Sequence, residues 1–202
     1  MEIRKLNDDD VKQFCSLILD MYKHLENLEW FSPMPFDEEN VKIMINKPRF
    51  YIVGAFEDEK LCGVASLDYK CGKLIGKVNF PKDCDTNKLV ETGFSIVHSS
   101  YRGRGIMKEM VKVVLEEAKN QGYQWVFGKV HKDNLASSKS LKKLGFEKFN
   151  DLNKEVKVSS IIQLLNDNVL NKNATQHMQE ILDKNQNSEF LIFNYDILMK
   201  KL

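Results

Sequence analysis

Two arginines and two glycines alternate in the stretch YRGRGIMKEM at residues 101–110. A strand-like segment precedes this stretch, and apolar residues at helical spacing follow it. A helix that opens at such a turn directs its first backbone N–H groups and the positive end of its dipole outward. The glycines let a ligand approach the backbone, while Arg102 and Arg104 add positive charge. The stretch is therefore typical of a site for phosphate oxygens.

Other interpretations of this stretch are weaker once its context is considered. In isolation, RGRG also fits a surface turn whose glycines permit the bend and whose arginines stay solvated. A dinucleotide-binding fingerprint would need glycine where Lys108 stands, and no GxxxxGK[ST] motif occurs in the chain. The order strand, turn and helix favours phosphate binding over a plain turn.

The composition predicts one ordinary globular core around this motif. The chain has 202 residues, of which 43% are hydrophobic and 29% charged. Thirty basic and 29 acidic residues leave a net charge of +1, which argues against nucleic acid or a membrane surface as partner. No apolar run reaches the roughly 18 residues of a membrane span, and no signal peptide is visible, so we expect a cytoplasmic protein. No metal site is expected, because no CxxC pair occurs among Cys15, Cys62, Cys71 and Cys84.

Periodicity and turn residues predict an alternation of strands and helices. A helix is expected at 11–25, and a second short helix begins near 37–39 and ends before Pro48. The expected strands lie at 2–6, 50–56, 61–69, 89–100 and 123–130. Two further helices, at 107–118 and 133–146, end near Gly122 and Gly145.

The chain resembles the GNAT superfamily of acyl-CoA-dependent N-acetyltransferases. The family signature is Arg or Gln, two residues, Gly, one residue, then Gly or Ala. The stretch Arg102, Gly103, Arg104, Gly105 and Ile106 matches that signature, and Met107 in its last place departs from it. A second block of the family, in the later helix, is matched by Asn134, Lys143, Gly145 and Phe146. The resemblance is sharp over about residues 90–149.

The resemblance implies an α/β (α+β) fold with a mixed, mostly antiparallel central sheet that is splayed between its fourth and fifth strands. Helices flank the sheet, and a helical insertion precedes the last strand. It implies a single acetyltransferase domain over 1–202, with a cofactor-binding core at 90–149, an insertion at about 155–186 and a final strand at about 189–200. Acetyl-CoA is the implied cofactor. Its implied contacts are Ser95, Ile96, Val97, Arg102, Gly103, Arg104, Gly105, Ile106, Met107, Asn134 and Ser137.

The implied reaction is attack of an amine on acetyl-CoA in a ternary complex. At pH 7 only about one alkylamine in 2,500 is neutral, so a group must accept the proton. Glu91 lies where family members with a glutamate base carry it, and Tyr69 and His98 are further candidates. The family's helix tyrosine is replaced by Leu141, whereas the Asn134–Ser137 spacing resembles a branch whose serine contacts the cofactor sulfur. An alternative is a non-catalytic acyl-CoA-binding regulatory module.

The acceptor side of the site is expected at two segments. The loop LEWFSPMPF offers Trp30, Phe31 and Phe36 as walls of an apolar pocket, and Tyr69 is a further substrate contact. About forty residues separate Phe149 from the last strand, enough for helices that cover the pocket or pair two copies of the chain. The charge of these segments is mixed, so we expect a small-molecule or peptide amine of unspecified identity.

Overall fold

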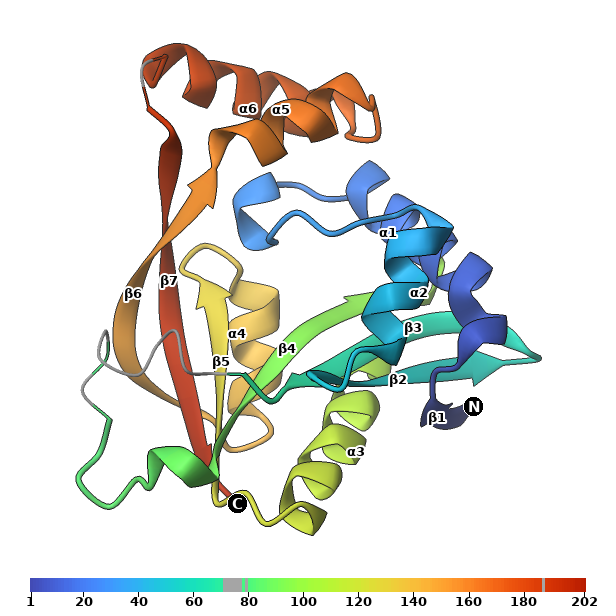
Figure 1. Ribbon diagram of the computed structural model, residues 1–202, viewed down its shortest axis with the longest axis vertical. Helices are drawn as coiled ribbons and strands as arrows, with labels where there is room; N and C mark the ends of the chain where they lie inside the picture. The colour runs from blue at the N-terminus through green and yellow to red at the C-terminus, as the bar shows by residue number, and fades with distance from the viewer. Residues whose placement is uncertain (71–77, 79, 187) are drawn as a thin grey trace.

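The computed structural model describes residues 1–70, 78, 80–186 and 188–202, and its centre is one sheet in the order β1-β2-β3-β4-β5-β7-β6 (Figure 1). Neighbouring strands are antiparallel except for the parallel pair β4 and β5. The predicted mixed, mostly antiparallel sheet is confirmed. The strands are β1 (Glu2–Lys5), β2 (Phe50–Glu57), β3 (Lys60–Asp68), β4 (Leu89–Val97), β5 (Trp125–His131), β6 (Glu147–Lys157) and β7 (Phe190–Lys201).

Helices cover both faces of the sheet, with α1 and α2 on one side and α3 and α4 on the other (Figure 1). The helices are α1 (Val11–Lys23), α2 (Glu38–Asn46), α3 (Ile106–Asn120), α4 (Leu135–Lys142), α5 (Val158–Asn166) and α6 (Lys172–Lys184). Short 3-10 turns are η1 (Asp8–Asp10), η2 (Leu28–Trp30), η4 (Thr86–Lys88) and η5 (Ser99–Tyr101). No helix in the described ranges is both long and apolar enough to span a membrane.

Local sequence signals account for most helix ends. The side chains of Asp37 and Asn134 cap α2 and α4 by accepting backbone N–H groups. Gly122 and Gly145 follow α3 and α4 with φ of 83°, a left-handed conformation that favours glycine. These are the caps and stops predicted from the sequence.

Successive residues of the strands belong to two separate apolar cores. Val64 of β3 packs in the core under α1, with Ile18, whereas its neighbour Ala65 packs in the core under α3, with Met110. This alternation follows from the opposite directions of successive side chains in a strand. Each large side chain that is fully buried contributes about 1.5–3 kcal/mol through removal of apolar surface from water.

The sheet opens between β4 and β5. These strands pair from Leu89 opposite Trp125 to Thr92 opposite Gly128, where the described ladder ends. The rest of β4 pairs with β3, while β5 continues along β7. The predicted splay between the fourth and fifth strands is confirmed, and a potential site lies in its opening.

Beside the opening, β4 departs from regular pairing. The register with β3 shifts near Ser66, whose hydroxyl accepts the N–H of Phe94 at 3.1 Å. A Cβ on Gly93 would lie 2.5 Å from that hydroxyl oxygen, so a larger residue here would displace the Ser66 side chain. The irregularity is a bulge of the kind that bends a strand at a functional site.

The insertion differs in its start from the sequence-based expectation. Strand β6 continues to Lys157, which pairs with Phe190, so the helical segment begins at Val158 instead of near 155. Its helices α5 and α6 pack against the loop that follows α1, and Asn171 donates to the carbonyl of Leu25 at 2.7 Å. The insertion therefore holds the loop that was expected to form the acceptor pocket.

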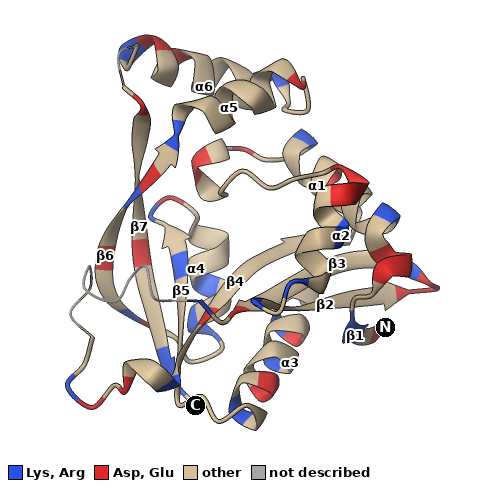
Figure 2. Cartoon of the chain, in the orientation of Figure 1, with Lys and Arg blue, Asp and Glu red and all other residues tan. Residues whose placement is uncertain are grey.

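Two expectations concern surface charge and thiols. Acidic and basic residues are interspersed over the elements without a single-sign face in this view (Figure 2). Cys15 and Cys62 are buried free thiols. In the part of the chain that the structure describes, no cluster of potential metal ligands is present. Cys71 lies outside the described residues.

Candidate active site

A cavity of about 470 Å³ lies at the opening between β4 and β5. The loop after α1 contributes Trp30 and Phe31, and β4 contributes Glu91 and Ser95. Further predicted residues come from the start of α3 and from α4; they are Met107, Asn134 and Ser137. The tertiary structure thus brings together, in one cavity, residues predicted for the acceptor, the chemistry and the cofactor.

Glu91 is a buried carboxylate in the wall of this cavity. Its residue is 8% exposed, and one carboxylate oxygen lies 2.8 Å from the Nζ of Lys129 on β5. Burial raises the pKa of Glu91, and the positive charge of Lys129 opposes that effect without reversing it. A carboxylate of raised pKa is a better proton acceptor than an exposed one.

A second ion pair lies beside Glu91. Asp68 of β3 is its partner in the strand register, and the guanidinium of Arg49 binds both oxygens of Asp68, with Nε at 2.7 Å from Oδ1. This bidentate pair fixes the Asp68 carboxylate within the cavity wall. The negative charge of Asp68 also contributes to the raised pKa of Glu91.

Lys154 of β6 is a cavity residue that the sequence analysis missed. Its ammonium donates to the hydroxyl of Ser32 and lies 5.3 Å from the ring centroid of Tyr195. Burial, together with the like charge of Lys129, lowers the pKa of Lys154 to about 8. The segment NDLNKEVK around it is polar and has no motif, so no local signal points to this lysine.

The turn before α3 has the geometry of an anion cradle. Gly103 and Gly105 adopt φ of 78° and 79°, and a Cβ on either would meet no other protein atom within 4 Å. Gly105 is the N-cap of α3, and no side chain caps this end. Arg102 and Arg104 are exposed on the same turn. Open space, uncapped N–H groups and guanidinium groups together suit a diphosphate.

Backbone groups of β4 face the opening. The N–H of His98 donates to the carbonyl of Cys62 on β3, and Ile96 pairs with Val64 in the same ladder. Because such groups alternate along an antiparallel strand, those of Ser95 and Val97 point toward the open side. The carbonyl of Val97 accepts from Arg102 at 3.3 Å. The remaining groups suit an extended ligand that carries amides.

At the start of α4, Asn134 already has a structural role. Its side-chain oxygen accepts the N–H of Ser137 at 3.1 Å, which caps the helix. Both residues also line the cavity, together with Leu141 in the place of the family's tyrosine. Asn134 can therefore contact a ligand while its side chain still caps α4.

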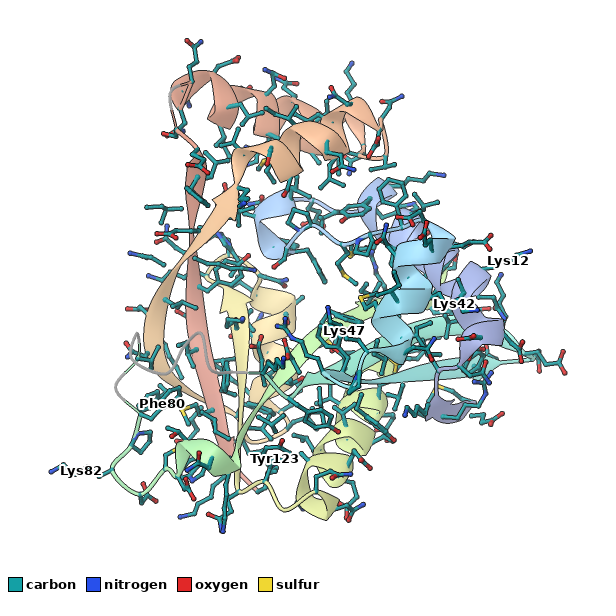
Figure 3. The ribbon with its side chains drawn as sticks, in the orientation of Figure 1. Lys12, Lys42, Lys47, Phe80, Lys82 and Tyr123 are labelled. Atoms are coloured by element: carbon teal, nitrogen blue, oxygen red, sulfur yellow. The ribbon has the colours of Figure 1, made fainter. Side chains whose placement is uncertain are left out.

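Several predicted residues lie away from the cavity lining. Tyr69 stacks on Tyr123 at 5.8 Å, near the C-terminal end of α3 (Figure 3). Phe36 packs edge-on against Tyr22 of α1 at 6.2 Å. The Nε2 of His98 lies 3.6 Å from Asp20, and its Nδ1 accepts from Ser100. The structure does not bring these three residues to Glu91.

A second group that the sequence analysis missed holds the loop after α1 in place. The Nε2 of buried His131 lies 3.0 Å from the carboxylate of Glu29, and its Nδ1 accepts the N–H of Asp133 at 3.3 Å. The hydroxyl of Tyr195 donates to the backbone carbonyl of Glu29. These contacts join η2 to β5 and β7, which lie far from it in the sequence.

Comparisons with known proteins agree with this geometry. A family model described as an acetyltransferase (GNAT) domain matches residues 1–147. No curated protein matches the chain. A ribosomal-protein-alanine N-acetyltransferase from Brucella melitensis has a similar structure, with TM-score 0.65, 17% identity and 100% coverage of both chains.

Two further solved structures share the fold. An N-acetyltransferase from Staphylococcus aureus Mu50 has TM-score 0.63 and 18% identity, covering 99% of this chain and 97% of its own. A Salmonella typhimurium protein described as an acetyltransferase was solved with its cofactor acetyl-CoA. It has TM-score 0.65 and 15% identity, covering 100% of this chain and 94% of its own. At these identities the likeness shows a common fold.

Proposed function

This chain belongs to the GNAT acetyltransferase family, and we propose that it transfers an acetyl group from acetyl-CoA to a primary amine by direct attack in a ternary complex. The acceptor is a small-molecule or peptide amine that enters beside the η2 loop. We also propose that residues 1–202 act as a single domain, with the core at 90–149 and the helical insertion acting as support for the acceptor loop.

The cavity around Glu91 is the observation that carries this proposal. A buried carboxylate of raised pKa lies where the sheet opens, in one continuous cavity with the aromatic loop and the start of α4. An amine and a thioester can therefore meet beside a proton acceptor. Holding both reactants in place supplies much of the rate advantage of such a reaction.

Acetyl-CoA supplies an activated acetyl thioester when it is bound. The uncapped N terminus of α3, with Arg102 and Arg104, would hold its diphosphate. The open-side backbone groups of Ser95 and Val97 would hold its amide-bearing arm, and their N–H groups are donors for the thioester oxygen. Asn134 would contact the same arm.

Glu91 acts in this proposal as the general base. It takes a proton from the acceptor ammonium, directly or through one water, and returns the nitrogen to its nucleophilic form. The positive charge of Lys129 favours the ionised form of this carboxylate and opposes the effect of its burial. Ser137 contacts the sulfur from the first turn of α4, where Leu141 offers no proton. As the new N–C bond forms and the C–S bond breaks, the sulfur would leave with the electron pair and take up the proton that the nitrogen loses on becoming an amide.

The direct test measures free thiol released from acetyl-CoA in the presence of a library of amines. We expect amine-dependent thiol release by the wild type and a loss of at least about 100-fold in kcat for Glu91→Gln, the upper range of a general base's contribution being about 10⁴. Glu155→Gln, an exposed glutamate of β6, is the matched control. Full activity of Glu91→Gln would remove Glu91 from this role.

Calorimetry separates catalysis from simple binding. We expect micromolar or tighter binding of acetyl-CoA, weakened by replacement of Arg102 or Arg104 with alanine. Binding without acetylation of any amine would contradict the proposed transfer. No binding of acetyl-CoA at all would contradict the proposed cofactor as well.

A further inference from the structure

Three cations line the cavity, and two of them have carboxylate partners. Arg49 binds Asp68 through two hydrogen bonds, and Lys129 binds Glu91 at 2.8 Å. Lys154 is the third cation, and among the described residues no carboxylate forms an ion pair with it. The five charged groups therefore leave the cavity with one excess positive charge.

The surroundings of Lys154 compensate only in part for this missing partner, because burial and the like charge of Lys129 oppose the ammonium form more strongly than the charge of Glu91 favours it. Its ammonium has a hydroxyl, that of Ser32, and the face of the Tyr195 ring as neighbours. Lys154 is partly buried, and a partly desolvated charge is costly unless it is paired, because neither a hydroxyl nor a ring fully replaces its hydration. The lowered pKa of Lys154 has burial as its main cause and agrees with that cost. By contrast, Lys12 and Lys42 of α1 and α2 extend outward from the fold (Figure 3).

We propose that Lys154, with Ser32, binds an anionic group of the acceptor, so that the acetylated substrate is an amine that also carries a carboxylate or a similar anion. This inference rests on the proposed acetyl transfer. It adds a charge requirement to the acceptor: the amine lies at Glu91, and the anion lies at Lys154 in the same cavity.

The rest of the cavity restricts the part of the acceptor between these two groups. Apolar side chains from the loop after α1, from α2 and from β2 line the same cavity as Lys154; they include Trp30, Phe31, Met34, Met44 and Phe50. Such walls favour an apolar body over a polar or highly charged one. The cavity of about 470 Å³ suits a small amino carboxylate or the end of a peptide.

The test compares amino carboxylates with their neutral carboxamides. L-Phenylalanine with L-phenylalaninamide and 6-aminohexanoate with 6-aminohexanamide supply a short and a long spacing between amine and carboxylate. The ratio of kcat/KM values within each pair is measured for the wild type and for Lys154→Met. We expect the variant to lower the carboxylate-to-amide ratio roughly 10- to 100-fold for the preferred pair, the range of a hydrogen bond to a charged group.

Two further variants separate charge from folding. Lys154→Arg keeps the positive charge and should keep most of the carboxylate preference. Lys157→Met removes an exposed lysine from the same strand and should leave the ratio unchanged. A ratio that is the same in the wild type and in Lys154→Met, for both pairs, would overturn the inference even if acetylation proceeds.

A binding measurement tests the anion site at Lys154 independently of the proposed acetyl transfer. Calorimetry of 3-phenylpropanoate and 3-phenylpropanamide, which carry no amine, should show carboxylate binding that weakens roughly 10- to 100-fold in Lys154→Met. If that dependence appears while no amine is acetylated, the anion site stands and the proposed transfer fails. If carboxylate binding does not depend on Lys154, the anion site fails whatever the enzyme acetylates.

Discussion

Replacing Lys129 by methionine would test the electrostatic basis of the site. The ammonium of Lys129 lies 2.8 Å from the Glu91 carboxylate, and Glu91 is 8% exposed. Methionine keeps much of the side-chain volume and removes the charge. The variant would therefore leave a buried carboxylate without its partner, which is more costly than the pair itself contributes.

The size of the effect follows from the protonation of Glu91. The unpaired carboxylate loses the least free energy if it binds a proton in the folded state. An unfolded glutamate has a pKa of about 4.3, so at pH 7 this uptake costs up to about 3.7 kcal/mol, at 1.36 kcal/mol per pH unit. At pH 5 the same cost is about 1 kcal/mol. A folded-state pKa above the unfolded one gives stability that is present below pH 4.3 or so and is lost as pH rises.

Urea unfolding of Lys129→Met and wild type at pH 5 and pH 7 measures this directly. We expect the loss of unfolding free energy to be larger at pH 7, by up to about 2.7 kcal/mol. The double variant Lys129→Met with Glu91→Gln should recover much of the loss, because it has no carboxylate to bury. An equal loss at both pH values, together with no recovery in the double variant, would refute the reasoning.

Three other outcomes follow from the structure. Because burial raises the pKa of Glu91, the rising limb of kcat/KM against pH should lie above the usual carboxyl range of about 4.3; a thiol-release profile with a limb below that range would contradict the base assignment. Gly93→Ala should lower the unfolding free energy by about 1–3 kcal/mol, since its Cβ would lie 2.5 Å from the hydroxyl of Ser66; an unchanged urea midpoint would contradict this. Gly105→Ala should cost about 1 kcal/mol through its φ of 79° and should weaken acetyl-CoA binding in calorimetry; unaltered affinity would argue against a diphosphate at this turn.

Much of the fold could be predicted because its signals are local. The caps at Asp37 and Asn134 and the stops at Gly122 and Gly145 act within one helical turn, so neighbouring residues determine them. The same holds for the turn before α3, where glycine and arginine spacing indicated an anion site. The family resemblance added the splay of the sheet, which the register of β4 and β5 confirms.

Strand β6 is an element that local sequence signals do not fully predict. Its second half, NDLNKEVK, is polar and lacks a clear strand pattern, yet it pairs with β7 as far as Lys157. Pairing with the neighbouring strand stabilises the extended conformation, for which the segment's own sequence shows no clear preference. For this reason Lys154 was not considered for the site.

The sequence by itself indicated the turn before α3 as a candidate anion site and predicted the helices around it, because these depend on residue type and short spacing. The family resemblance added Glu91 as a candidate base. The tertiary structure alone decided which groups meet Glu91 and which do not. Strand register places Lys129 beside it, and the β6 strand brings Lys154 to Ser32, which is 122 residues away in the chain. Tyr69 ends the segment 61–69 that was predicted as a strand beside the site, but its ring stacks on Tyr123 and does not reach Glu91. Contacts between distant segments depend on the register of the whole sheet, and no short stretch of sequence encodes that register.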